Sequence, residues 1–81
     1  MSARYDYSKL RGKIREVFFT QEKFAEAMGI STTTISYKLN GLTEWTQEEI
    51  EKAVEVLSIP YEEIHVYFFT RKVEKNSTNE E

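Results

Sequence analysis

The sequence predicts an all-α fold, specifically a five-helix bundle, and two observations support this. First, apolar residues recur at helical spacing in several short segments, as at Leu10, Ile14, Val17 and Phe18. Second, residues with capping and turn chemistry separate these segments. The chain has 81 residues, the size of one small domain, and such a domain can bury about 60% of its unfolded surface.

The sequence that follows the first helix predicts two short helices joined by a tight turn. Asp6 or Ser8 is expected to cap the first helix, and Thr20 to cap the second. Gly29 stands where a helix end favours a left-handed residue. Ser31 is expected to cap the third helix, which ends in turn-forming residues. The residues expected inside these two helices are Phe24, Ala25, Met28, Ile35 and Leu39.

Two further helices are predicted in the second half of the chain. Thr46 and Glu49 have the spacing of a capping box, and Pro60 fits just before the first turn of the last helix. The segment 65–73 is compatible with the end of that helix and also with a short strand, because it is rich in β-branched and aromatic residues. The buried stripes are expected to contain Ile50, Ala53, Val54 and Leu57, then Ile64 and Phe68.

The net charge of −3 is unevenly distributed. Residues 1–41 carry seven basic and four acidic residues, a net charge of +3, whereas residues 42–81 carry four basic and ten acidic residues, a net charge of −6. Surface potential depends on local charge as well as on the total. The first half of the chain could therefore face a phosphate backbone while the second half faces away.

Several classes of protein are excluded by composition. The chain has no cysteine, hence no disulfide and no cysteine-ligated metal site, which is compatible with a reducing cytosol. It has no apolar run of about 18 residues and no signal-peptide pattern, so we expect a cytoplasmic protein that does not span a membrane. His65 is the only histidine and has no accompanying nucleophile or second ligand. We therefore expect no enzyme, no cofactor and no metal site.

Three short patterns are informative in combination: Gln21-x-x-x-Ala25, Gly29-Ile30-Ser31 and Leu57-x-Ile59-Pro60. Together they resemble the lambda-repressor and Cro family of helix-turn-helix regulators, and more closely its small phage-encoded members. The resemblance covers about residues 7–69. It implies a transcriptional regulator that binds double-stranded operator DNA, usually as a homodimer. The chain then divides into a helix-turn-helix DNA-binding domain at 1–69 and a polar, partly disordered tail at 70–81.

The resemblance also assigns DNA contacts on and around the third helix. It implies that Gln21 grips a phosphate and that Thr32, Thr33 and Tyr37 read base edges in the major groove. Lys38 stands where many relatives carry an aromatic residue or leucine, and we expect it to be free to reach a phosphate. Ser31, Thr34 and Asn40 are candidates for phosphate contact or helix capping, and the Ser36 hydroxyl could serve either in that way or in base reading.

An alternative function stays open at this point. The loop after the third helix reads Leu42-Thr43-Glu44-Trp45 and lacks the basic groups that relatives often place there. Phosphate neutralisation supplies much of the affinity for DNA, so an acidic chain with such a loop could instead bind a protein. The alternative is an interaction module on the same fold, such as an anti-repressor that binds a partner phage regulator and occludes its DNA-binding face.

Overall fold

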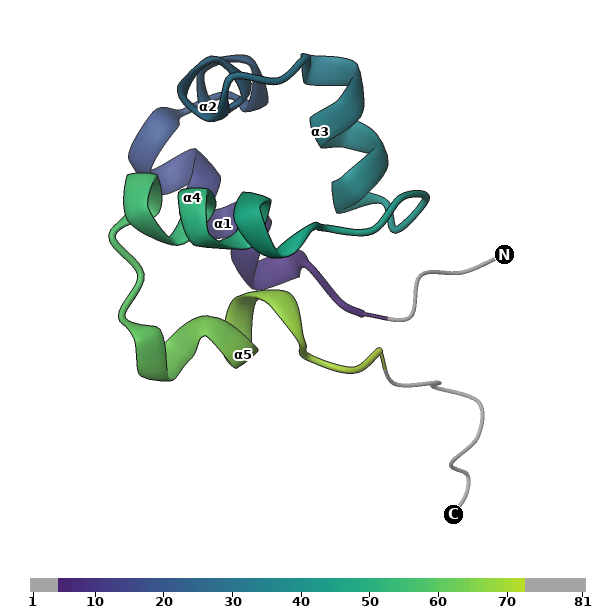
Figure 1. The fold of residues 1–81 in the computed structure, drawn as a ribbon, viewed down its shortest axis with the longest axis vertical. Helices are drawn as coiled ribbons and strands as arrows, with labels where there is room; N and C mark the ends of the chain where they lie inside the picture. The colour runs from purple at the N-terminus through teal and green to yellow at the C-terminus, as the bar shows by residue number, and fades with distance from the viewer. Residues whose placement is uncertain (1–4, 73–81) are drawn as a thin grey trace.

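The computed structural model describes residues 5–72, which form five α-helices and one 3-10 turn (Figure 1). The predicted all-α five-helix bundle is therefore confirmed for this part of the chain. Residues 1–4, and 73–81 of the predicted tail, lie outside the described residues. The elements are α1 (Ser8–Phe18), α2 (Gln21–Met28), α3 (Thr32–Leu39), α4 (Gln47–Leu57), η1 (Tyr61–Glu63) and α5 (Ile64–Phe68).

The helices enclose one core, with α2 and α3 at one end and α5 at the other (Figure 1). Helix α1 packs against α2, α4 and α5, and α4 also packs against α2. Burying each large apolar side chain in this core contributes about 1.5–3 kcal/mol of transfer free energy. The largest fully buried side chains are Phe24, Phe68, Leu10, Ile14, Ile35 and Leu57.

The predicted starts of α2, α3 and α4 are confirmed by side-chain hydrogen bonds. The cap predicted for the first helix is wrong, because the N-cap residue of α1 is Tyr7, whose side chain caps nothing. The Asp6 carboxylate instead accepts from the backbone N–H and the hydroxyl of Ser8, in the first turn. The Thr20 hydroxyl accepts from the backbone N–H of Lys23 at 3.1 Å. At α4, Thr46 and Glu49 form a reciprocal capping box, each side chain accepting from the other's backbone N–H. Gly29 ends α2 at φ 77°, in the left-handed region that glycine tolerates best. Caps can be predicted from sequence because donor and acceptor are only a few residues apart.

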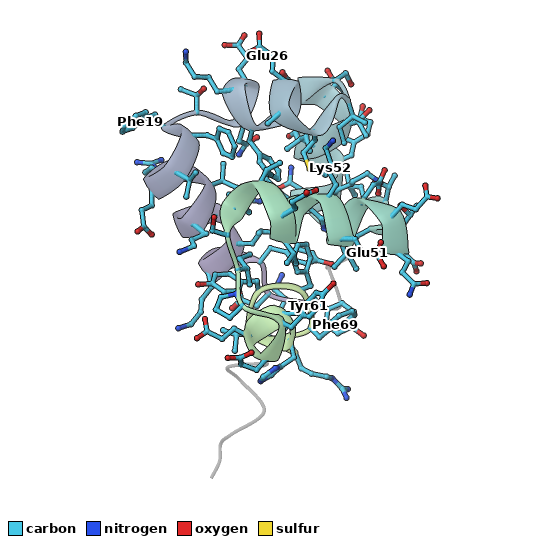
Figure 2. The ribbon with its side chains drawn as sticks, turned by 60° about the vertical axis from the view of Figure 1, so that its left-hand side comes forward. Phe19, Glu26, Glu51, Lys52, Tyr61 and Phe69 are labelled. Carbon is cyan, nitrogen blue, oxygen red and sulfur yellow. The ribbon has the colours of Figure 1, made fainter. Side chains whose placement is uncertain are left out.

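Helix α1 ends in a strained turn at Phe19. The backbone N–H of Thr20 donates to the carbonyl of Phe18 at 2.8 Å, and Phe19 between them has φ 72° and ψ −38°. This is the positive-φ form of the γ-turn, which is rare and strained. The Phe19 side chain is 75% exposed and projects from the edge of the molecule (Figure 2). Val17, predicted to be inside, lies at the margin of the apolar stripe and is also exposed.

The two predictions for the segment after residue 64 are resolved in favour of a helix. Helix α5 continues to Phe68, which is buried against the ring of Trp45 with centroids 5.2 Å apart. After α5 the chain makes an isolated antiparallel bridge between Tyr5 and Arg71 instead of a strand. Phe69 is 47% exposed, with one edge against Tyr5. No helix in residues 5–72 is long and apolar enough to cross a membrane.

Candidate functional site

Helices α2 and α3 form a helix-turn-helix arrangement whose geometry follows from a few residues. The turn between them spans residues 29–31. Within it, the backbone N–H of Ile30 donates to the carbonyl oxygen of Ala25 at 3.1 Å. Ala25 is small and buried, so α3 can approach α2 closely, and Ile35 anchors α3 from its own side. One side of α3 therefore lies on the bundle, and the opposite side faces solvent.

The exposed side of α3 is uncharged. Thr32, Thr33 and Tyr37, the three residues predicted to read bases, are all exposed, Tyr37 to 48%. The chain turns back after α3, where Leu42 donates its backbone N–H to the Tyr37 carbonyl at 2.9 Å. Leu42 is 62% exposed beside this turn. We call Thr32, Thr33, Tyr37 and Leu42 the α3 surface.

Two of the other predicted hydroxyl groups, those of Ser31 and Thr34, take part in the N-terminal cap of α3. The Ser31 hydroxyl accepts from the backbone N–H of Thr34 at 3.1 Å and donates to the Thr34 hydroxyl at 2.9 Å. Ser36 is half-buried, as is Gln21 in the first turn of α2. The predicted cap at Ser31 is confirmed. The DNA contacts predicted for these residues are not tested by the fold and stay predictions.

Lys38 is not free to reach a phosphate, so the prediction for this residue is wrong. Its Nζ lies 2.9 Å from a carboxylate oxygen of Glu49 and donates to the carbonyl of Glu44 at 2.8 Å. The Lys38 side chain is only 7% exposed. It turns inward because Glu49, held at the start of α4 by the capping box, offers an anionic partner beside the ring of Trp45. The single cation of α3 is therefore neutralised within the bundle.

Partial burial of Glu49 disfavours the charged carboxylate and by itself would raise the pKa, but hydrogen bonds and a nearby positive charge have the larger, opposite effect. The backbone N–H of Thr46 and the ammonium group of Lys38 both favour the charged carboxylate. The pKa of Glu49 consequently lies below its ordinary value. Glu49 therefore carries its negative charge at neutral pH, and its contact with Lys38 ties the last turn of α3 to the first turn of α4.

Arg11 supplies a contact that the sequence did not predict. From α1, its Nη2 donates to the Leu39 carbonyl at 3.0 Å and to Oδ1 of Asn40 at 2.7 Å. The guanidinium group thus satisfies a carbonyl at the C-terminal end of α3, where a positive charge is favourable. Asn40, predicted to contact phosphate, is oriented by this bond. The partners are 28 and 29 positions apart in the chain, so local patterns give no signal for them.

The residues that could ligate a metal ion do not gather in the described part of the chain. Among residues 5–72, no group of three or more histidine, aspartate or glutamate side chains is arranged to hold a metal ion. The α3 surface is neutral, and the packed pair of helices α2 and α3 presents it to solvent. An exposed, largely polar helix face of this kind can contact a macromolecule without any chemical step.

Comparisons with known proteins point to phage regulation. The family described as "Protein of unknown function (DUF739)" matches residues 1–71. The chain is 51% identical in sequence to the modulator of repression (MOR) of the temperate bacteriophage TP901-1 from Lactococcus lactis, whose solution structure has been determined. That match covers 88% of this chain and 96% of the other, with a TM-score of 0.73. A comparison with curated proteins gave no match.

Proposed function

We propose that this chain, which belongs to the family described as "Protein of unknown function (DUF739)", modulates repression in a phage or prophage by binding a regulator protein. The similarity to a phage modulator of repression supports a regulatory role. Modulation of repression can act on the repressor or on its operator. The surface of α3 favours the first of these, the alternative that the acidic composition kept open.

The observation that carries the proposal is the inward orientation of Lys38. DNA interfaces are strongly basic, and lysine and arginine contacts to phosphate supply much of their affinity. Here the one cation on α3 is paired with Glu49, and Arg11 is bonded to the end of the helix. The following loop adds Leu42 and Glu44 and no basic residue before α4. Neither α3 nor the loop that follows it therefore offers an unpaired cation to an operator phosphate.

The same surface has features of a protein interface. The central parts of protein interfaces are depleted of charge and enriched in aromatic residues, tyrosine among them. Tyr37 and Leu42 are large, exposed and held together by a backbone hydrogen bond. The flanking threonines, Thr32 and Thr33, can hydrogen-bond without bringing a charge into the interface. This combination suits a partly apolar protein surface better than a phosphate backbone.

Occlusion gives such binding a regulatory effect. A regulator that reads operator DNA must expose its own recognition helix and the basic residues around it. A small protein seated over that region prevents operator binding without touching DNA itself. The net charge of −3 fits this action, because it favours approach to a basic surface and disfavours approach to DNA.

Direct operator binding is the second candidate, and the helix-turn-helix arrangement is the observation that favours it. Thr32, Thr33 and Tyr37 stand exposed on the helix that the predicted family places in the major groove. The family resemblance itself and the predicted homodimer stay predictions. The two candidates differ in salt dependence, because a helix that contacts several phosphates loses affinity steeply as salt rises.

The test uses the repressor encoded in the same phage or prophage genome, purified and titrated with this chain in a calorimeter. We expect a complex, and we expect Tyr37→Ala to weaken it by about tenfold or more, as for a buried aromatic contact. Tyr61→Ala is the matched control, because Tyr61 is 76% exposed on η1, at the opposite end of the bundle from α3 (Figure 1). Absence of a complex, together with enrichment of one operator from random DNA, would favour the second candidate.

A further inference from the structure

We propose that the groove between α1 and the start of α2 binds a carboxylate side chain of the partner protein, next to an apolar side chain of the same segment. This inference rests on the proposed function and specifies where, beyond the α3 surface, the partner is held. The groove is lined by Arg11, Gly12, Ile14, Arg15, Phe19, Thr20 and Gln21.

One side chain links the groove to the C-terminal end of α3. Arg11 lines the groove and also bonds to Leu39 and Asn40 at the end of α3. A partner seated on Tyr37 and Leu42 therefore needs only to extend along this end of α3 to reach the groove. We treat the two regions as one candidate interface, with a neutral part on α3 and a cationic part on α1.

Gly12 keeps the groove open at the cost of helix stability. It lies in the middle of α1, where glycine is less favourable than alanine. A Cβ atom at this position would meet nothing within 4 Å, so no packing inside the protein requires a glycine. Absence of a side chain instead leaves room over this turn of α1. That space suits the backbone or side chain of another molecule.

Phe19 is unfavourable for the isolated protein in two respects. Its backbone occupies a strained γ-turn at φ 72°, a region that favours glycine. Its ring is 75% exposed and projects outward beside the groove (Figure 2). Glycine would relieve the strain and remove the exposed ring. Contact with an apolar side chain of a partner explains why a phenylalanine stands here.

The charge of the groove identifies the polar part of the occupant. Arg11 and Arg15 both line it, and among residues 5–72 no carboxylate lies within ion-pair distance of either guanidinium group. A guanidinium group binds a carboxylate through two parallel hydrogen bonds. Arg15 is exposed and can make such a pair, and Gln21 can add a hydrogen bond from the start of α2.

A DNA phosphate would use only part of this site. The arginines suit any anion, but Phe19 and the open space over Gly12 offer nothing to a phosphate backbone. A peptide that carries a glutamate or aspartate beside an apolar residue uses all of these features. The acidic residue pairs with Arg15, and the apolar residue covers Phe19. We therefore assign the groove to a protein segment rather than to nucleic acid.

The experiment measures the affinity of the full chain for the same repressor with matched pairs of variants. Arg15→Glu reverses the charge in the groove, and Lys9→Glu makes the same change at an exposed position of α1 outside it. Gly12→Leu fills the groove, and Lys9→Leu adds the same side chain elsewhere on α1. Leucine is a good helix former, so Gly12→Leu is expected to stay folded. We expect both groove variants to bind about tenfold more weakly or worse, and both Lys9 variants to bind as wild type.

A charge-swap series identifies the occupant. Each exposed acidic residue of the repressor is changed to lysine, and one such change is expected to restore binding to the Arg15→Glu variant. The groove assignment is overturned if both groove variants bind the repressor as wild type does. The carboxylate assignment is overturned if no reversal restores binding, or if Arg15→Glu instead abolishes binding to a random DNA duplex. If wild type does not bind the repressor at all, the proposed function itself fails, and this inference fails with it.

Discussion

The Nζ of Lys38 lies 2.9 Å from a carboxylate oxygen of Glu49, and this ion pair joins the last turn of α3 to the first turn of α4. The ammonium group also donates to the Glu44 carbonyl and lies 6.0 Å from the centroid of the Trp45 ring. The pair therefore has two consequences. It fixes the end of α3, and it removes the only cation of that helix from the surface.

Breaking the ion pair from either side should destabilise the fold, and the effects of the two substitutions should not be additive. Lys38→Met keeps most of the length of the side chain but leaves Glu49 without its partner, and we expect it to lower the free energy of unfolding by about 1–3 kcal/mol. Glu49→Gln should cost a similar amount. Because the residues are in contact, the double variant should be less destabilised than the two single losses added together. Urea unfolding of all four proteins measures this coupling, and strict additivity would show that the pair contributes nothing.

Glu49 should also make stability depend on pH. Because the pKa of Glu49 is lowered in the folded state, its contribution to stability is present above its ordinary pKa of 4.5 and is lost as pH falls through the lower folded value. The stability advantage of wild type over Glu49→Gln should therefore shrink below about pH 4.5. Asp6, whose pKa is lowered by hydrogen bonds from Ser8, titrates in both proteins and cancels in the difference. A difference that stays constant from pH 7 to pH 3 would contradict this assignment.

Phe19→Gly should stabilise the isolated protein. Glycine adopts φ 72° without steric cost, so the strain of the γ-turn is relieved. The exposed ring contributes little packing to the free protein. We expect a gain of about 0.5–1 kcal/mol, since the greater flexibility of glycine in the unfolded chain offsets part of the relief. Thermal unfolding measures the change, and a lower melting temperature would show that the ring packs within the protein.

Arg11 should act as a stabiliser of the end of α3. Arg11→Met removes the hydrogen bonds to Leu39 and Asn40 and keeps most of the aliphatic stem, and we expect a loss of about 1–2 kcal/mol. The amide protons at the end of α3 should exchange faster with solvent in this variant. Lys9→Met on the same helix provides the control. Equal exchange rates in both variants would show that the Arg11 contact has no structural effect.

The fold could be predicted from sequence to the extent that local interactions determine it. The caps at Thr20, Ser31 and Thr46 and the left-handed Gly29 were all expected, because each depends on residues a few positions apart. The buried stripes were also expected, with Val17 as an exception at a margin.

The contacts that shape the candidate site could not be predicted, because they join different helices. The sequence marks Lys38 as polar and places it on α3, but nothing local indicates that Glu49 will lie opposite it. The bond from Arg11 to Asn40 spans 29 positions. The γ-turn at Phe19 could not be predicted either, since its hydrogen bond leaves no compositional signal.

The two candidate functions differ in whether a protein or DNA occupies the α3 surface. The decisive measurement is a competition in which the repressor, bound to its labelled operator, is titrated with wild type and with Tyr37→Ala. We predict that wild type releases the operator from the repressor, that Tyr37→Ala does so about tenfold less effectively, and that neither shifts the operator alone. Binding of wild type to the operator in the absence of the repressor, lost in Tyr37→Ala, would contradict the account.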